Sequence, residues 1–470
     1  MRKTKIVCTI GPASSSEEVL TRMCEAGMNV ARINFSHGDH AEHLAKIETI
    51  KRVREKLGMP IAIMLDTKGP EYRIRTVENG KITLREGAPF TLTVDDVVGD
   101  ETRVSVNYEG LVNDLAPGDR VLLANGLMAL RVDEIVGHDI HCTVTEGGEL
   151  SDRKSMSFPN KVLKQAYLSE QDKLDMLFGV EHGVDYIACS FVSVRQDLVD
   201  VHEFLNAHGG ENISLIAKIE NQSGIDNIES ICEECEGIMI GRGDMGVEIP
   251  FEKLPAIQKQ LITKCRMLGK RVITATEMLE SMIHKPRPTR AETSDVANAI
   301  YDGSSAIMLS GETAAGEYPV LTLQTMARIA EQTESDIHYE SRFRKAEFTI
   351  QNTVDAISHS VCGMAIDLDA KAIAVCSISG KTVRMVSRFR SPATILGITT
   401  DERSWRHLAL SWGVLPVMCD TFDSTDVLFY TAKQLAKQHL KLKSGDKIII
   451  TGGIANGVSG NTNLIKVEKI

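Results

Sequence analysis

Apolar and polar positions along the first 70 residues predict three strands separated by two helices. Short β-branched runs at residues 5–10, 29–34 and 61–65 have the length of buried strands. Between them, residues 17–26 and 41–57 carry apolar side chains at helical spacing, and the serines at 14–16 provide capping residues for the first helix. Strands that alternate with helices indicate parallel strands joined by helical crossovers.

The helical spacing stops at about Pro70 and does not return before Lys164. We find no convincing helix in this stretch. Turns that contain glycine or proline separate short strand-like runs, at residues 81–84, 90–94, 103–106, 120–123, 129–135 and 140–144. This pattern predicts a small all-β domain inserted into the first domain.

From Ser169, a residue suited to a helix N-cap, strands and helices alternate again. Five more strands are predicted, at residues 185–189, 214–219, 237–240, 271–275 and 305–309. Eight β/α units over roughly 250 residues outside the insertion are typical of a (β/α)8 TIM barrel. A doubly wound open sheet is the alternative that the pattern leaves open.

The last part of the chain predicts a separate α/β domain. A helix near residues 321–335 and a polar segment up to Lys345 lead out of the barrel. Helices at 353–364 and 427–439 and strands at 372–376, 394–398 and 447–451 follow. We place the barrel at residues 1–69 and 167–340, the inserted β domain at 70–166 and the C-terminal domain at 341–470.

Composition and charge narrow the classes of function. The 470 residues are 43% hydrophobic and 25% charged, as in ordinary globular proteins, and the net charge of −11 predicts no broad basic surface for nucleic acid or an anionic membrane. Gly11 and Pro12 break the short apolar stretch at the start, so we expect no secretory signal there. No apolar run approaches the roughly 20 residues of a membrane span. We expect a cytoplasmic protein in which the close pair Cys232 and Cys235 occupies ordinary helix positions.

Polar side chains recur at the ends of the predicted barrel strands, where barrels of this type form their sites. A cap or a surface position would explain any one of them. Together they predict one shared site, formed by Arg32, Asn34, Asp66, Thr67, Ser190, Lys218, Glu220, Asp244, Thr276 and Glu312.

Lys218 and Glu220 are two positions apart in a strand, so their side chains lie on the same side. A structural ion pair is one interpretation. In the other, Glu220 and Asp244 supply hard oxygen ligands for Mg²⁺, and Lys218 places positive charge against a developing oxyanion. Asp244 belongs to the glycine-rich segment 241–246, whose backbone N–H groups are available to a carboxylate or a phosphate.

Two further polar sets are candidates for ion binding. The first, with a single charge, suits a monovalent cation, although turn and capping roles would explain each member: Asn34, Ser36, Asp66 and Thr67. The second follows the first strand of the C-terminal domain and predicts either a phosphate cradle or a helix cap: Ser377, Ser379, Gly380 and Thr382. The glycine-rich segment 451–460 follows a later strand and could close over the same ligand.

Several longer segments match one known family in order along the chain. They are Lys5-Ile-Val-Cys-Thr-Ile-Gly-Pro12, Asn34-Phe-Ser-His-Gly38, Asp66-Thr-Lys-Gly-Pro-Glu71, Lys218-Ile-Glu-Asn221, Gly241-Arg-Gly-Asp-Met-Gly-Val-Glu248, Ile273-Thr-Ala-Thr276 and Lys285-Pro-Arg-Pro-Thr-Arg-Ala-Glu292. On these segments the chain resembles the pyruvate kinase family over essentially its full length. The resemblance implies phosphoryl transfer from phosphoenolpyruvate to ADP, the cofactors Mg²⁺ and K⁺, a lid formed by the inserted domain, and a homotetramer with an allosteric C-terminal domain.

The resemblance also implies roles for single residues. Arg32 would bind the substrate phosphate, Lys218 would stabilise the transferring phosphoryl group and the enolate, and Thr276 would orient the proton donor. By position, the resemblance implies that the backbone of Gly243 and Asp244 binds the substrate carboxylate, and that Glu220 and Asp244 bind Mg²⁺. It implies that K⁺ is bound by Asn34, Ser36, Asp66 and Thr67, and the nucleotide by Arg73 and Lys154. A sugar-phosphate effector would be bound by Ser377, Ser379, Gly380 and Thr382. Glu71 matches the K⁺-dependent form of the family.

Some positions depart from the family pattern. Ala124-Asn125-Gly126 stands where the family usually has Asp-Asp-Gly, Ser193 where many members have Arg, and Ser157 where Asn is frequent. These changes put nucleotide affinity and lid closure in question more than the reaction.

Two other classes of function stay open. One is a Mg²⁺-dependent aldolase or lyase that acts through a pyruvate enolate, and ADP dependence of pyruvate formation separates it from a kinase. The other is a metabolite-sensing protein on an inactive barrel, which the presence of Lys218, Glu220 and Asp244 disfavours.

Overall fold

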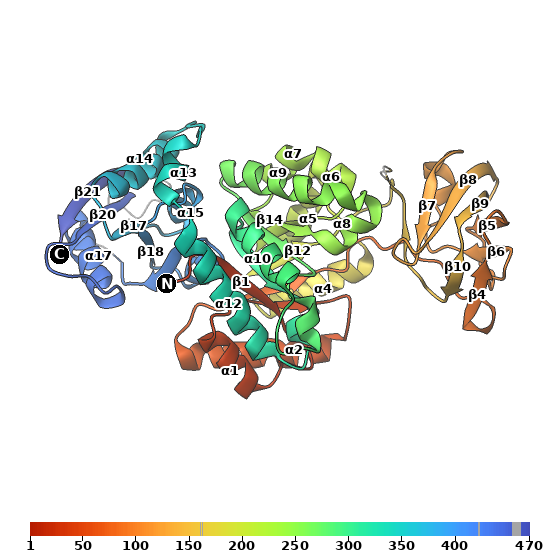
Figure 1. Ribbon diagram of the computed structural model, residues 1–470, viewed down its shortest axis with the longest axis horizontal. Coiled ribbons are helices and arrows are strands. Elements are labelled where there is room, and N and C mark those ends of the chain that lie inside the picture. Colours follow the sequence, from red (N-terminus) through yellow and green to blue (C-terminus); the bar gives the residue numbers. More distant parts are fainter. Residues whose placement is uncertain (160, 162, 422–423, 454–461) are drawn as a thin grey trace.

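The computed structural model describes residues 1–470 except 160, 162, 422–423 and 454–461. Three bodies follow one another along the long axis (Figure 1): an α/β body at one end, a helix-covered barrel in the middle and an all-β body at the other end. Most of the glycine-rich segment 451–460 lies outside the described residues.

The middle body is a closed barrel of eight parallel strands, as the spacing of the strands predicts. The doubly wound open sheet is wrong, because β1 pairs with both β2 and β16 and the sheet has no free edge. In barrel order the strands are β1 (Lys5–Thr9), β2 (Val30–Asn34), β3 (Ala62–Asp66), β12 (Tyr186–Cys189), β13 (Ser214–Ile219), β14 (Gly237–Gly241), β15 (Arg271–Ala275) and β16 (Ala306–Leu309).

Several of the helices that surround the barrel begin at side-chain caps. The oxygens of Ser16, Asp39, Ser169 and Thr289 each accept a backbone N–H of the first helical turn, which confirms Ser169 as an N-cap. The helices of this body are α1 (Glu17–Glu25), α2 (His40–Leu57), α4 (Glu170–Glu181), α5 (Arg195–Ala207), α6 (Gln222–Asp226), α7 (Ile228–Glu233), α8 (Arg242–Glu248), α9 (Leu254–Met267), α10 (Arg290–Asp302), α11 (Gly311–Ala314) and α12 (Pro319–Asp336). No helix in the described part of the chain is long and apolar enough to cross a membrane.

The inserted body contains a six-stranded sheet and a two-stranded sheet. Its strands are β4 (Lys81–Leu84), β5 (Pro89–Thr93), β6 (Arg103–Ser105), β7 (Arg120–Leu123), β8 (Met128–Val136), β9 (Asp139–Glu146), β10 (Gly148–Ser151) and β11 (Met156–Ser157). The sequence pattern misses β10, β11 and the one-turn helix α3 (Leu111–Asp114).

The C-terminal body is a five-stranded sheet in the order β19-β18-β17-β20-β21, with β21 antiparallel. Its elements are α13 (Tyr339–Lys345), α14 (Thr353–Asp367), β17 (Ala372–Cys376), α15 (Lys381–Arg388), β18 (Thr394–Thr399), α16 (Glu402–Leu408), β19 (Val414–Met418), α17 (Thr425–His439), β20 (Lys447–Gly453) and β21 (Thr462–Lys469). The pattern misses both edge strands. Pro416 obscures β19, and polar residues interrupt β21, as the exposure of an edge strand permits.

The C-terminal body closes the amino-terminal end of the barrel. Leu410 is fully buried among the side chains of the barrel interior, including Val7 and Tyr186. The Tyr186 hydroxyl donates to the carbonyl of His407 at 2.6 Å. Because this end is filled, the carboxyl ends of the strands are left as the place for a site.

Asp185, directly before β12, connects the two bodies. One carboxylate oxygen accepts the Ile63 N–H at 2.8 Å, and the other accepts Nε of Arg406 in α16 at 2.7 Å. Its exposed fraction is 3%, so both interactions are shielded from water.

We expect Asp185→Asn to lower the free energy of unfolding by about 3 kcal/mol, because removing one partner of a buried ion pair leaves Arg406 without its buried countercharge. Urea denaturation measures the effect. Glu402→Gln is the matched control: Glu402 pairs with the same Arg406 from the surface, and its loss should cost less than about 1 kcal/mol. Equal losses in the two variants would contradict the buried role of Asp185.

Candidate active site

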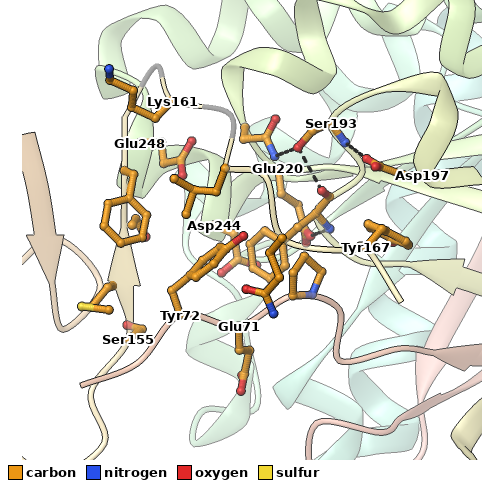
Figure 2. Close-up of a pocket in the computed structure, with 18 of the residues that line it drawn as sticks. Glu71, Tyr72, Ser155, Lys161, Tyr167, Ser193, Asp197, Glu220, Asp244 and Glu248 are labelled. Atoms are coloured by element: carbon orange, nitrogen blue, oxygen red, sulfur yellow. Dashed lines mark hydrogen bonds between the residues drawn. The ribbon is translucent and has the colours of Figure 1, made fainter. Parts of the chain in front are cut away.

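A cavity of about 430 Å³ lies between the carboxyl end of the barrel and the inserted β body (Figure 2). Glu220 and Asp244 line it from the barrel, and Glu71 and Asn125 line it from the inserted segment. The turn of Asn125 also contacts α8, since a Cβ added to Gly126 would lie 3.4 Å from Cγ1 of Val247. Both bodies therefore form the cavity together.

Lys218 is the centre of a buried charge cluster at the mouth of the barrel. Its Nζ lies 3.0 Å from Asp66 Oδ1, 3.2 Å from Glu220 Oε1 and 2.6 Å from Ser190 Oγ. Burial favours the neutral amine, but the two carboxylates overcome this effect and raise the pKa of Lys218 to about 12. The side chain is therefore a fixed cation at neutral pH.

Asp66 joins this cluster to Arg32. Nε of Arg32 donates to Asp66 Oδ2 at 2.6 Å, and its Nη1 donates to the hydroxyl of Thr9 at 2.8 Å. Burial alone would raise the pKa of Asp66, but the charges and hydrogen bonds of Arg32 and Lys218 hold it below its usual value. Two cations thus share one ionised carboxylate.

Glu220 is held from two sides. Its Oε2 accepts the backbone N–H of Phe191 at 2.9 Å, and a Cβ at Gly241 would lie 2.6 Å from its Oε1. Glycine at position 241 is therefore required for this carboxylate to lie where it does. Burial and the nearby charge of Asp244 raise the pKa of Glu220, and Lys218 opposes this shift.

Asp244 and Thr276 lie on neighbouring strand ends. Asp244 makes no hydrogen bond or ion pair with the described residues, and it is exposed to the cavity. The hydroxyl of Thr276 accepts the N–H of Gly243 at 2.9 Å and donates to the carbonyl of Ala275 at 2.6 Å. The glycine-rich segment after β14 is thereby fastened to the end of β15.

Arg242 is a site residue that the sequence analysis misses. Thr276 and Glu277 adopt left-handed φ values of 70° and 52°, which are unfavourable for side chains of this kind. The Arg242 guanidinium bonds to the carbonyls of both residues and pairs with Asp295 at 2.7 Å. An arginine between two glycines at the end of a strand is the only sequence signal that indicates this role.

The oxygen-rich set follows two paired strands. Asn34 and Asp66 are partners in register at the ends of β2 and β3. Oδ1 of Asn34 accepts the Ser36 N–H at 3.1 Å, and the Thr67 hydroxyl accepts the Ser190 N–H at 3.2 Å. These bonds agree with the turn and capping interpretation, and they do not test the cation interpretation.

Other predicted residues lie away from the cluster. Glu312 is fully buried and accepts the N–H groups of Leu279 and Ser310, so it supports loops instead of facing the cavity. Arg73 lines the cavity and binds Glu71 through Nε and Nη2 at 3.0 and 2.8 Å, whereas Lys154 is exposed outside it.

The phosphate cradle predicted in the C-terminal body is at the start of α15. Gly380 has a φ of 70°, and the buried hydroxyls of Thr382 and Thr462 lie 2.5 Å apart. Ser377 donates its N–H to the carbonyl of Ile398 at 2.9 Å, and Ser379 is exposed. Thr382 thus joins the helix to β21.

Comparisons with known proteins agree over the full length of the chain. The family model described as "Pyruvate kinase, barrel domain" matches residues 1–323, and "Pyruvate kinase, alpha/beta domain" matches residues 355–468. The pyruvate kinase of Clostridium acetobutylicum is 45% identical and covers 100% of both chains, and that of Geobacillus stearothermophilus is 46% identical over 100% of this chain and 80% of the relative. A crystal structure of a pyruvate kinase from Cryptosporidium parvum superposes with a TM-score of 0.94 at 36% identity, over 100% of this chain and 96% of the other. The chain belongs to the pyruvate kinase family.

Proposed function

We propose that this enzyme transfers the phosphoryl group of phosphoenolpyruvate to ADP in the cavity between the barrel and the inserted β body, giving pyruvate and ATP. The observation that carries the proposal is the charged Lys218, buried between Asp66 and Glu220 at the mouth of the barrel. Phosphoryl transfer depends mainly on positioning and on fixed positive charge, and this cluster supplies both.

Arg32 and Lys218 are proposed to hold the substrate phosphate. Asp66 binds both cations, and the Nη2 group of Arg32 makes no hydrogen bond with the described residues. Their orientation is therefore set before substrate binds, and little reorganisation opposes the stabilisation of the transition state. Lys218 would also stabilise the enolate that remains after transfer.

Glu220 and Asp244 are proposed to hold Mg²⁺. Two observations support the fit of these residues to the ion. Both carboxylates line one cavity, and Asp244 lacks a partner among the described residues. The charge of Asp244 also raises the pKa of Glu220. Mg²⁺ needs few protein ligands, because it takes substrate phosphate oxygens and water for the rest. When bound, the ion neutralises charge on the transferring phosphoryl group.

We assign K⁺ to Asn34, Ser36, Asp66 and Thr67. The support is the pairing of Asn34 with Asp66 at the ends of neighbouring strands, which brings several oxygen atoms to one part of the rim. Asp66, the single charged member, is shared with Arg32 and Lys218, so a monovalent cation is the better fit.

The backbone of Gly243 and Asp244 is proposed to bind the substrate carboxylate, which would compete with Thr276 for the Gly243 N–H. Thr276 would then orient the proton donor that converts the enolate to pyruvate. Its hydroxyl is suited to this because the Ala275 carbonyl and the Arg242 network fix its position.

The inserted β domain, residues 70–166, is proposed to act as a lid over the nucleotide, with Arg73 and Lys154 as its contacts. Arg73 is bridged to Ser155, next to Lys154, so a rotation of the lid would move both side chains together. Closure would exclude water and favour transfer to ADP over hydrolysis. Asn125 replaces a family carboxylate here and instead accepts a hydrogen bond from Ser155 at 2.7 Å.

The C-terminal domain, residues 341–470, is proposed to bind a sugar phosphate or nucleotide near Ser377, Ser379, Gly380 and Thr382, and to control the barrel within a cytoplasmic homotetramer. The support is the family resemblance together with the position of these residues at the start of α15. The Thr382 hydroxyl already contacts Thr462, so we expect the backbone and the serines to provide most of the ligand contacts.

We expect Lys218→Met to lower kcat for pyruvate formation by at least about 100-fold, because it removes a preorganised cation from the transition state. Pyruvate release from phosphoenolpyruvate, with and without ADP, measures the effect. Lys264→Met, which removes a surface partner of Glu229, is the control and should retain full activity. Pyruvate release without ADP would instead favour the lyase hypothesis, and an active Lys218→Met enzyme would refute the role of this lysine.

We expect Glu220→Gln and Asp244→Asn each to weaken binding of Mn²⁺, a spectroscopic substitute for Mg²⁺, by at least about tenfold, because a neutral amide is a poorer ligand for a hard cation. Electron paramagnetic resonance of the full chain without substrates reports free Mn²⁺ directly. Glu252→Gln, an exposed carboxylate beyond α8, should leave the affinity unchanged. Unchanged binding in Asp244→Asn, which breaks no contact within the described protein, would remove this pair as the metal site.

A further inference from the structure

A second cavity, of about 360 Å³, lies where the barrel, α13 and the C-terminal body meet. In Figure 1, α13 belongs to the C-terminal body, where its Phe343 packs against His359 of α14. Arg266 and Asp302 reach the cavity from α9 and α10, Arg342 reaches it from α13, and Arg390 and Trp412 reach it from the C-terminal body. It shares no lining residue with the cavity at the carboxyl end of the barrel.

Positive charge exceeds negative charge in this cavity. The described lining residues include one carboxylate, Asp302, and four cationic side chains, which are Arg266, Arg342, Lys345 and Arg390. One carboxylate oxygen of Asp302, Oδ1, is paired with Lys259 outside the lining, and the other, Oδ2, is buried without a hydrogen-bond partner among the described residues. Arg342 and Arg390 bond to backbone carbonyls and a serine hydroxyl, and neither forms an ion pair with a described residue.

Three buried donors have no acceptor among the described residues: Nε of Arg266, Nε of Arg390 and the hydroxyl of Tyr339. The guanidinium of Arg266 makes no hydrogen bond or ion pair with any described residue. Burial and the charge of Arg342 lower the pKa of Arg266, and burial and the charge of Arg266 lower that of Arg390 to about 9. The arginines therefore repel one another in a poorly hydrated place, which is unfavourable for the protein alone.

The remaining wall is aromatic. It consists mainly of Phe343, Phe348, Phe389 and Trp412. The guanidinium of Arg390 lies 4.7 Å from the centroid of the Trp412 ring, which is close enough for a cation–π contact with this wall. Unpaired arginines beside aromatic rings favour a ligand with an anionic group and a flat apolar body.

We propose that this cavity binds a compact organic anion whose carboxylate or phosphate is held by Arg266 and Arg390 and whose flat body packs on the aromatic wall. Such a ligand touches the barrel, α13 and the C-terminal body at once. The site is separate from the phosphate cradle at Ser377–Thr382, none of whose residues lines it.

The test uses 1-anilinonaphthalene-8-sulfonate, a flat aromatic anion, with the full-length chain. The sequence has two tryptophans, Trp405 and Trp412. The substitution Trp405→Phe leaves Trp412 as the single tryptophan, so the fluorescence emission reports on this cavity. We expect saturable quenching of Trp412 by the probe. N-phenyl-1-naphthylamine, which has the same ring system without the sulfonate, should bind at least tenfold more weakly.

In the same background, we expect Arg266→Met to weaken probe binding at least tenfold. The melting temperature without probe should stay the same or rise, because the substitution removes an unpaired charge. Arg342→Gln is a second variant and should weaken binding at least threefold; within the described chain, the Arg342 guanidinium bonds to the Tyr301 carbonyl alone. Arg52→Met, at an exposed arginine of α2, is the control and should leave the affinity within twofold.

Three outcomes would overturn the proposal. The first is the absence of Trp412 quenching by the anionic probe. The second is equal affinity for the anionic and the uncharged probe, which would indicate an apolar cavity only. The third is unchanged probe affinity in Arg266→Met and Arg342→Gln.

Discussion

The buried ionic cluster of Lys218, Asp66, Glu220 and Arg32 is the constraint on which the active end of this barrel depends. Removing four charges from water costs several kcal/mol for each ion, and only close, fixed contacts recover that cost. The barrel provides these contacts through its register, because Lys218 near the end of β13 and Glu220 directly after β13 point to the same side, where Asp66 ends β3. A shift of one residue in either strand would direct a charge into the apolar layer outside the barrel.

Strained backbone supports this cluster from outside. Phe191 has a φ of 56° and directs its N–H to Glu220, and Thr276 and Glu277 are also left-handed where the chain leaves β15. Each such residue costs about 1–3 kcal/mol and persists only where surrounding contacts determine it. Arg242 provides those contacts for the second turn by binding its carbonyls and Asp295. The strained turn at Thr276 and Glu277 and the Arg242 contacts that hold this turn therefore act together to position Thr276.

The C-terminal body contributes side chains that complete the structure of the barrel. Leu410 fills the barrel base, and Asp185 is bound by Arg406 across the junction. Two ion pairs between described residues cross this junction, Asp185 with Arg406 and Glu236 with Arg384. Arg266, Arg342 and Arg390 have no carboxylate partner among the described residues, and they surround the cavity for which we propose an anionic ligand. A ligand that neutralises these arginines would therefore act at the junction of the two bodies.

The sequence by itself determined the barrel, the insertion, the C-terminal α/β body and most of the residues at the rim. It could do so because strand and helix periods are local, and because parallel strands in a barrel bring their carboxyl ends to one rim. Only the tertiary structure decided the contacts among those residues. It shows that two cations share Asp66 and that Glu312 binds loop backbone instead of facing the cavity. It also places Lys154 outside the cavity and Arg242 within the site. The edge strands β19 and β21 could also be identified only in the tertiary structure, since they become strands by pairing with a neighbouring strand. Which charges face each other, and which find no partner, is set by closure of the chain in three dimensions, because residues far apart in sequence share no local period that would reveal their contact.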